Sequence, residues 1–181
     1  MSAVVPVHSV HFYDTDQSLI DRVCGIVSSG LNRGNVVLTA TTQDHQDQLI
    51  YALEQKGVDM AAHIQEKRFI TWDMKKILSR FMVRGLPHTG FFKSAVRSLL
   101  EDAQKSAGGK EQGLVAFGEM VSVLWDEGNH AGALALENLW NDLLSEKAFH
   151  LHCAYPRSFF SKDKTGLLDI CESHSHIVGA N

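Results

Sequence analysis

Hydrophobic positions along the chain alternate between short apolar runs and stretches with helical spacing. The runs at 7–13, 36–40, 69–72, 114–117 and 149–154 have the length and residue types of buried strands. Between them, apolar residues recur every three or four positions, as expected for helices with one buried face. This alternation predicts an α/β fold, with a mostly parallel sheet and helices on both faces.

Residues at the ends of these segments predict where the helices begin and end. Thr15 is a candidate start for the first helix, and Gly30 is expected to end it. Gly57 is expected to close the second helix. Asp73 has the residue type and position to cap the helix that follows the third strand.

The chain has no change of composition that would divide it. Its 181 residues contain no internal repeat, no low-complexity tract and no Pro/Ser-rich linker. The length suits one domain with a substantial hydrophobic core. Residues 106–111, with two adjacent glycines, are expected to form a surface loop between elements. We therefore predict a single domain spanning 1–181.

Charge and composition exclude several classes of protein. The net charge of −4 provides no broad basic field for nucleic acid or an anionic membrane. No apolar run approaches the roughly 20 residues that span a bilayer, and the N-terminal sequence lacks the features of a signal peptide. Three cysteines are too few and too scattered for a disulfide framework. These features predict a cytoplasmic protein that binds neither nucleic acid nor membrane directly.

A series of short segments over nearly the whole chain carries a family resemblance. They are His11-Phe12-Tyr13, Gly30 to Gly34, Phe117 to Val121, Leu124-Trp125 with Gly128-Asn129, Leu136 to Asn141, Cys153 to Pro156, and Cys171 with His174. In this order they resemble the MEDS family, the methanogen/methylotroph DcmR-type sensory domain. The resemblance implies a three-layer RecA/KaiC-like fold and detection of small molecules, with hydrocarbon derivatives proposed for the family.

The same resemblance implies a signalling role. Relatives look like input modules attached to histidine kinases or transcription regulators. The 181 residues leave no room for an output domain beside the sensory one. We therefore expect the domain to act through a separate partner, such as a kinase or regulator, or through a second copy of itself.

The loop after the second strand lacks the residues that bind phosphate. A RecA-like protein would place its phosphate loop at 34–45, but the turn at 41–45 is Thr-Thr-Gln-Asp-His, without glycine or lysine. Gly109-Lys110-Glu111 has the wrong spacing and no Ser or Thr after the lysine. Glu119, at the end of an apolar strand, then has no phosphate anchors beside it. We predict a non-catalytic domain without a cofactor.

Ligands of parallel α/β sheets bind outside the carboxyl ends of the strands. We therefore expect a small organic ligand there, and the predicted contacts are Tyr13, Thr41, Asp73, Glu119, Trp125 and Tyr155. For Glu119, a carboxylate at a helix N-terminus is an equally good explanation. Arg157 would either pair with an acidic ligand group or lie in solvent. Trp140 lies among leucines on the most apolar helix and is expected in the core.

The ten histidines raise the question of a metal site. His150 and His152 would share one face of a strand, and His174 and His176 follow near the C-terminus. Their spacings are looser than those of secure zinc sites, and Cys153 is expected on the opposite strand face. The sequence therefore predicts no metal. Two alternatives to a sensory domain stay open, an interaction scaffold on a degenerate nucleotide-binding fold and a divergent metal- or thiol-dependent enzyme.

Overall fold

The computed structural model describes residues 5–106 and 113–179. The predicted surface loop beyond Ser106 and the Gly109-Lys110-Glu111 segment lie outside the described residues.

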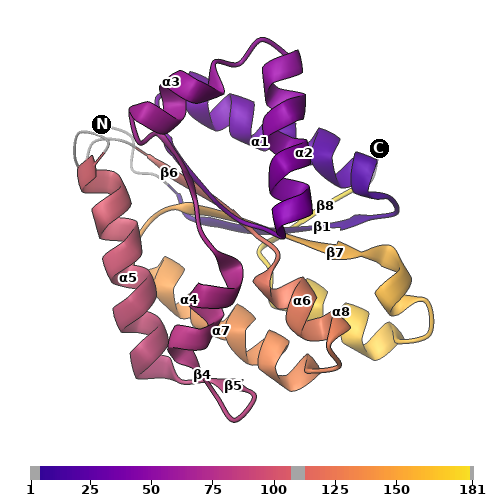
Figure 1. The fold of residues 1–181 in the computed structure, drawn as a ribbon. Coiled ribbons are helices and arrows are strands. Elements are labelled where there is room, and N and C mark those ends of the chain that lie inside the picture. The colour runs from indigo at the N-terminus through magenta and orange to yellow at the C-terminus, as the bar shows by residue number, and fades with distance from the viewer. Residues whose placement is uncertain (1–4, 107–112, 180–181) are drawn as a thin grey trace.

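A parallel sheet with the strand order β3-β2-β6-β7-β1-β8 forms the centre of the molecule (Figure 1). Each pair of neighbouring strands in it runs parallel. The strands are β1 (Val7–Tyr13), β2 (Val36–Ala40), β3 (Phe69–Thr71), β6 (Leu114–Gly118), β7 (His150–Pro156) and β8 (His176–Val178).

Helices cover both faces of this sheet (Figure 1). One face carries α1 (Asp16–Asn32), α2 (Gln43–Gln55) and α3 (Met60–Gln65). The other carries α4 (Met74–Phe81), α5 (Thr89–Ser106), α6 (Met120–Asp126), α7 (His130–Glu146) and α8 (Lys164–Glu172). The predicted α/β class, with a parallel sheet between two helical layers, is confirmed.

Two apolar cores lie on the two faces of the sheet. Strands β2 and β6 are buried along their whole length, because alternate residues face each core. Leu38 and Ala116 face the larger core, under α4 to α8, whereas Val37 and Phe117 face the core under α1 to α3. Continuous apolar runs were therefore the correct signal for these strands.

The glycine predictions have different outcomes. Gly57, with φ +79°, follows the C-cap Lys56 and closes α2, as predicted. The prediction that Gly30 ends the first helix is wrong, because α1 continues to Asn32 and the glycine with positive φ is Gly34. Gly30 lies inside the helix, where a Cβ would stand 2.8 Å from a methyl group of Val37. Its missing side chain permits close packing of α1 on the sheet.

Three features of the fold were not predicted. Helix α3 is only six residues long, and β8 has three residues, too few for a periodic pattern. A hairpin of β4 (Met82–Val83) and β5 (Leu86–Pro87) joins α4 to α5. In the described part of the chain, no helix is both long and apolar enough to cross a membrane.

Candidate functional site

Glu119 joins two helix N-termini at the carboxyl edge of the sheet. It is the N-cap residue of α6, but its side chain turns toward α2. There its carboxylate accepts a hydrogen bond from the Thr42 backbone N–H at 3.2 Å and contacts His45 Nδ1 at 2.7 Å. This hydrogen bond with Glu119 raises the pKa of His45, and Asp16 adds a smaller effect in the same direction. Within the structure, the N-terminus of α2 is thus already paired with an anionic group.

The other predicted contacts at this edge lie in separate hollows. Tyr13 lines a shallow pocket with Arg22, and burial, together with the Glu119 and Asp16 carboxylates, raises the pKa of Tyr13. Thr41 and Asp73 line a different, open groove of about 1080 Å³ beside β3. Asp73 also caps α4 by accepting a hydrogen bond from the Lys76 backbone N–H, so its predicted capping role is confirmed.

Trp125 and Tyr155 lie in the core under the sheet rather than in an open pocket. Trp125 is 5% exposed, and its ring stacks on His130 with the centroids 4.1 Å apart. Tyr155 is completely buried and meets the Trp125 ring edge to face. Trp140 is buried as predicted. Arg157 pairs with Asp14 at 3.2 Å. The structure therefore does not bring the six predicted contacts together in one pocket.

A small cavity of about 20 Å³ lies under the carboxyl-terminal halves of β2 and β6, between the sheet and helices α6 and α7. This volume has room for about one water-sized group. The wall is almost entirely apolar, and includes Leu38, Ala116, Met120, Trp140, Leu151 and Cys153. Such a space favours an apolar guest over water, because its wall offers few hydrogen-bond partners.

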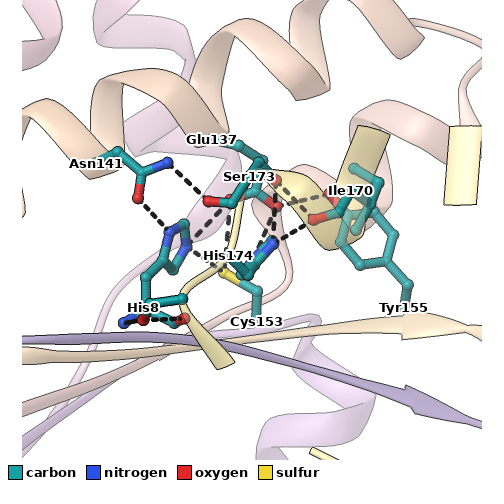
Figure 2. Close-up of polar contacts among 9 residues, drawn as sticks. His8, Glu137, Asn141, Cys153, Tyr155, Ile170, Ser173 and His174 are labelled. Atoms are coloured by element: carbon teal, nitrogen blue, oxygen red, sulfur yellow. Dashed lines mark hydrogen bonds and ion pairs between the residues drawn. The ribbon is translucent and has the colours of Figure 1, made fainter. Parts of the chain in front are cut away.

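Next to this cavity, the thiol of Cys153 belongs to a buried polar cluster (Figure 2). Glu137, on α7, is completely buried at its centre. Its carboxylate accepts a hydrogen bond from the Tyr155 hydroxyl at 2.8 Å and lies 3.2 Å from His8 Nε2 and 3.5 Å from His174 Nε2. The Cys153 sulfur lies 3.5 Å from His8 Nε2 and 3.9 Å from Glu137 Oε2.

Two hydrogen bonds fix the orientation of the imidazole rings in this cluster (Figure 2). Asn141 donates its side-chain N–H to the Ser173 carbonyl at 2.7 Å, so its oxygen faces His8 and accepts from Nδ1–H at 2.8 Å. His174 Nδ1–H donates to the Ile170 carbonyl at 2.7 Å. Both rings therefore present Nε2 to the Glu137 carboxylate.

Burial dominates the acid–base properties of the cluster. It raises the pKa of the Cys153 thiol, and the Glu137 carboxylate raises it further. Burial also lowers the pKa of His174, although Glu137 opposes this effect. For Glu137 itself, the penalty of burial is outweighed by His174, His8 and the Tyr155 hydroxyl, so the pKa of that carboxyl is lowered. The two histidines and the Tyr155 hydroxyl thus favour the ionised form of the Glu137 carboxyl in spite of its complete burial.

Most of this cluster was not predicted from the sequence. Of its members, His174 and Cys153 were considered, but in combination with His150 and His152. Those two histidines lie on the opposite strand face from Cys153, as the alternation predicted, and His152 contacts Ser9 there. His8 and Glu137 gave one weak signal, since each is a polar residue at an otherwise apolar position of its element.

Among solved structures, one protein of similar fold matches nearly the whole chain. The fold of this chain is similar to the crystal structure of the uncharacterised protein PH0321 from Pyrococcus horikoshii in complex with an unknown peptide, with a TM-score of 0.64, 15% sequence identity, and coverage of 98% of this chain and 77% of that one. At this identity the likeness shows the fold alone.

Two curated relatives are similar over part of their length. The ClpB chaperone proteins of Tropheryma whipplei strains TW08/27 and Twist are each 28% identical over 134 residues, or 73% of this chain. The chain spans less than a fifth of either chaperone, 18% and 17% of their lengths. The family model described as "MEthanogen/methylotroph, DcmR Sensory domain" matches residues 7–175, nearly the whole chain. This protein therefore belongs to the MEDS family of sensory domains.

Proposed function

We propose that the chain is a non-catalytic, cytoplasmic sensory domain that binds a small organic ligand in the cavity under strands β2 and β6. The observation that supports this proposal best is the cavity itself, a space with an apolar wall that borders the buried polar cluster at Cys153. An unfilled apolar cavity lowers stability, and binding of a guest offsets that cost. The cavity volume favours a molecule of very few heavy atoms, such as a simple hydrocarbon derivative.

The contacts of Glu119 support a role without nucleotide chemistry. In P-loop proteins, backbone N–H groups at a helix N-terminus bind the phosphates. At the corresponding end of α2, the Glu119 carboxylate accepts from the Thr42 N–H and is paired with His45. A phosphate there would meet a buried carboxylate, which favours the interpretation of a degenerate nucleotide-binding fold.

In this proposal, the ligand signal passes to a separate partner, such as a histidine kinase, a transcription regulator or a second copy of the chain. Helices α6 and α7 line the cavity and meet at a turn containing Asn129. The Asn129 side-chain N–H donates to the Gly85 carbonyl at the tip of the β4–β5 hairpin, at 2.7 Å. Val83, Leu86 and Phe91 are exposed around this hairpin. A shift of α6 or α7 on ligand binding would thus reach an exposed apolar surface.

The ligand proposal is tested by titration with one-carbon alcohols, thiols and halides, the smallest members of these classes. The readout is the indole N–H resonance of Trp140, which lines the cavity. We expect a saturable shift with at least one of these compounds. Ala116→Val adds two methyl groups to the cavity wall. It should weaken that binding by about 10-fold, because these methyl groups occupy volume that the ligand would otherwise fill. Ala52→Val, on α2 and remote from the cavity, is the control and should bind as the unaltered chain does.

The opposite results would reject the cavity as the ligand site. An Ala116→Val chain that binds as tightly as the unaltered chain places the ligand elsewhere. If the Trp140 resonance shifts with none of the compounds, the cavity does not bind ligands of this size.

A second candidate function is peptide binding in the groove beside β3. In the described residues, β3 is an edge strand of the sheet, and peptides bind such edges by adding a strand. The structural relative PH0321 is described as bound to an unknown peptide. Selection from a displayed peptide library tests this candidate, with Ile64→Glu in the groove expected to abolish binding and Leu168→Glu, exposed on α8, expected to preserve it.

A further inference from the structure

Four side chains from distant parts of the chain converge in the buried cluster. His8 comes from β1, Glu137 from α7, Cys153 from β7, and His174 from the turn between α8 and β8. Their nitrogen, oxygen and sulfur atoms lie within 4.8 Å of one another. Imidazole, carboxylate and thiolate are the groups that zinc and related divalent ions prefer.

Both histidines direct an Nε2 lone pair into the centre of the cluster. Their Nδ1–H groups are taken by Asn141 Oδ1 and the Ile170 carbonyl, oxygen atoms that can only accept. The neutral ring then has no proton on Nε2. His174 Nε2 is buried, finds no hydrogen-bond partner in residues 5–106 and 113–179, and faces Glu137 Oε1 at 3.5 Å. With Nε2 unprotonated, two electron-rich atoms face each other at this distance, and they repel unless a proton or a metal ion lies between them.

The charges of the cluster balance around one divalent ion. The Glu137 carboxylate and a Cys153 thiolate together carry two negative charges, and the two imidazoles are neutral. A bound dication brings the sum to zero, which a fully buried site requires.

Several distances in the cluster are close to those around a four-coordinate ion, and all pairs of candidate ligand atoms lie within 4.8 Å. In a tetrahedral zinc site, neighbouring ligand atoms are about 3.3 to 3.8 Å apart, given the usual bond lengths. His8 Nε2 lies 3.2 Å from Glu137 Oε2, and His174 Nε2 lies 3.5 Å from the other carboxylate oxygen, Oε1. The Cys153 sulfur lies 3.5 Å from the His8 nitrogen and 3.9 Å from the Glu137 oxygen.

We propose that His8, Glu137, Cys153 and His174 form a closed, four-ligand binding site for a zinc-type divalent ion. On binding, the Cys153 thiol loses its proton to solvent and its sulfur coordinates the ion. Asn141 and the Ile170 carbonyl orient the two imidazoles, as partners of metal-bound histidines commonly do.

The site has a structural rather than a catalytic design. Because protein atoms fill all four positions, no position is left for a substrate. The ion would link β1, α7, β7 and the segment between α8 and β8, so its binding energy would contribute to folding. The inference is independent of the ligand cavity, although Cys153 borders both sites.

The test uses the full chain, unfolded in the presence of a chelator and refolded with or without Zn²⁺. Elemental analysis and native mass spectrometry then measure bound zinc, and we expect about one ion per chain. Refolding with Co²⁺ should give the intense visible bands of a four-coordinate ion and a thiolate-to-cobalt charge-transfer band.

Variants assign the metal to these residues. Cys153→Ser and His174→Gln should lose the bound zinc, and Cys153→Ser should also lose the charge-transfer band. Cys171→Ser and His176→Gln change the same residue types outside the cluster and should retain one ion. Asn141→Ala should weaken zinc binding by about 10- to 100-fold, because it releases the His8 ring.

Three results would overturn the proposal. They are a refolded wild-type chain without zinc, a cobalt spectrum without the thiolate band, and a Cys153→Ser chain that binds zinc as the wild type does. The cobalt spectrum requires no variant to fold. If the chain binds no zinc but the Trp140 resonance still shifts with ligand, the proposed sensory function is retained and the metal site is rejected. If zinc binds but the Trp140 resonance does not shift, the metal site is retained and the ligand cavity is rejected.

Discussion

At the scale of single residues, the sequence was informative where a side chain acts on its own local backbone. The cap at Asp73 and the buried position of Trp140 follow from neighbours within a few positions. The cluster around Glu137 does not, because its contacts join residues far apart in the chain, 145 positions in the case of His8 and Cys153. Only the topology of the sheet brings them together, since β1 and β7 are neighbouring strands.

The pairing of Glu119 with His45 gives a pH-dependent prediction. Because the contact raises the pKa of His45 above 6.5, its contribution to stability is fully present below pH 6.5 and is lost as the pH rises through the folded-state value. Glu119→Gln removes the negative partner, so NMR titration should show the His45 pKa shifted downward. As the pH rises through this range, the stability of the Glu119→Gln variant should then decrease less than that of the unaltered chain.

Asp16→Asn is the matched control for this prediction. Asp16 lies 3.5 Å from His45 on the exposed side and should produce a smaller decrease in the His45 pKa. An unchanged His45 titration in the Glu119→Gln chain would show that the pair contributes nothing.

At the scale of elements, strong hydrophobic patterns correctly predicted the long helices and buried strands, but not where every helix ends. Long helices and fully buried strands carry enough periodic positions to be recognised, whereas α3, β8 and the β4–β5 hairpin are too short. Gly30 was misassigned because a glycine that ends a helix and one that permits close packing look alike in sequence. Which role applies depends on a neighbouring strand.

Two glycines in α1 provide a direct test of this interpretation. Gly30→Ala places a methyl group against the Val37 side chain, which has little rotamer freedom, and should lower the free energy of unfolding by about 1 to 2 kcal/mol. Gly25→Ala in the same helix meets no atom within 4 Å and should raise it by about 0.5 to 1 kcal/mol. Urea denaturation measures both, and stabilisation by both substitutions would contradict the packing role.

At the scale of the whole molecule, the sheet separates two kinds of site. The carboxyl edge, where ligands of this fold class were expected, carries Glu119 and the open hollows. The cavity begins below this edge, under the last residues of β2 and β6 and next to Trp72, which also lines the open groove. The buried cluster lies within the larger core under the sheet. The family and fold class were accessible from the sequence, because they depend on the order of many segments. The cavity was not, because it is a property of how side chains from β2, β6, β7, α6 and α7 pack.

If the space under β2 and β6 accepts a small apolar guest, a crystal pressurised with xenon should reveal it. Xenon enters dry apolar cavities without needing polar partners. We expect a xenon atom between the sheet and α7, in contact with Ala116 and Trp140. Crystals that take up xenon only in the surface hollows, or not at all, would contradict this expectation.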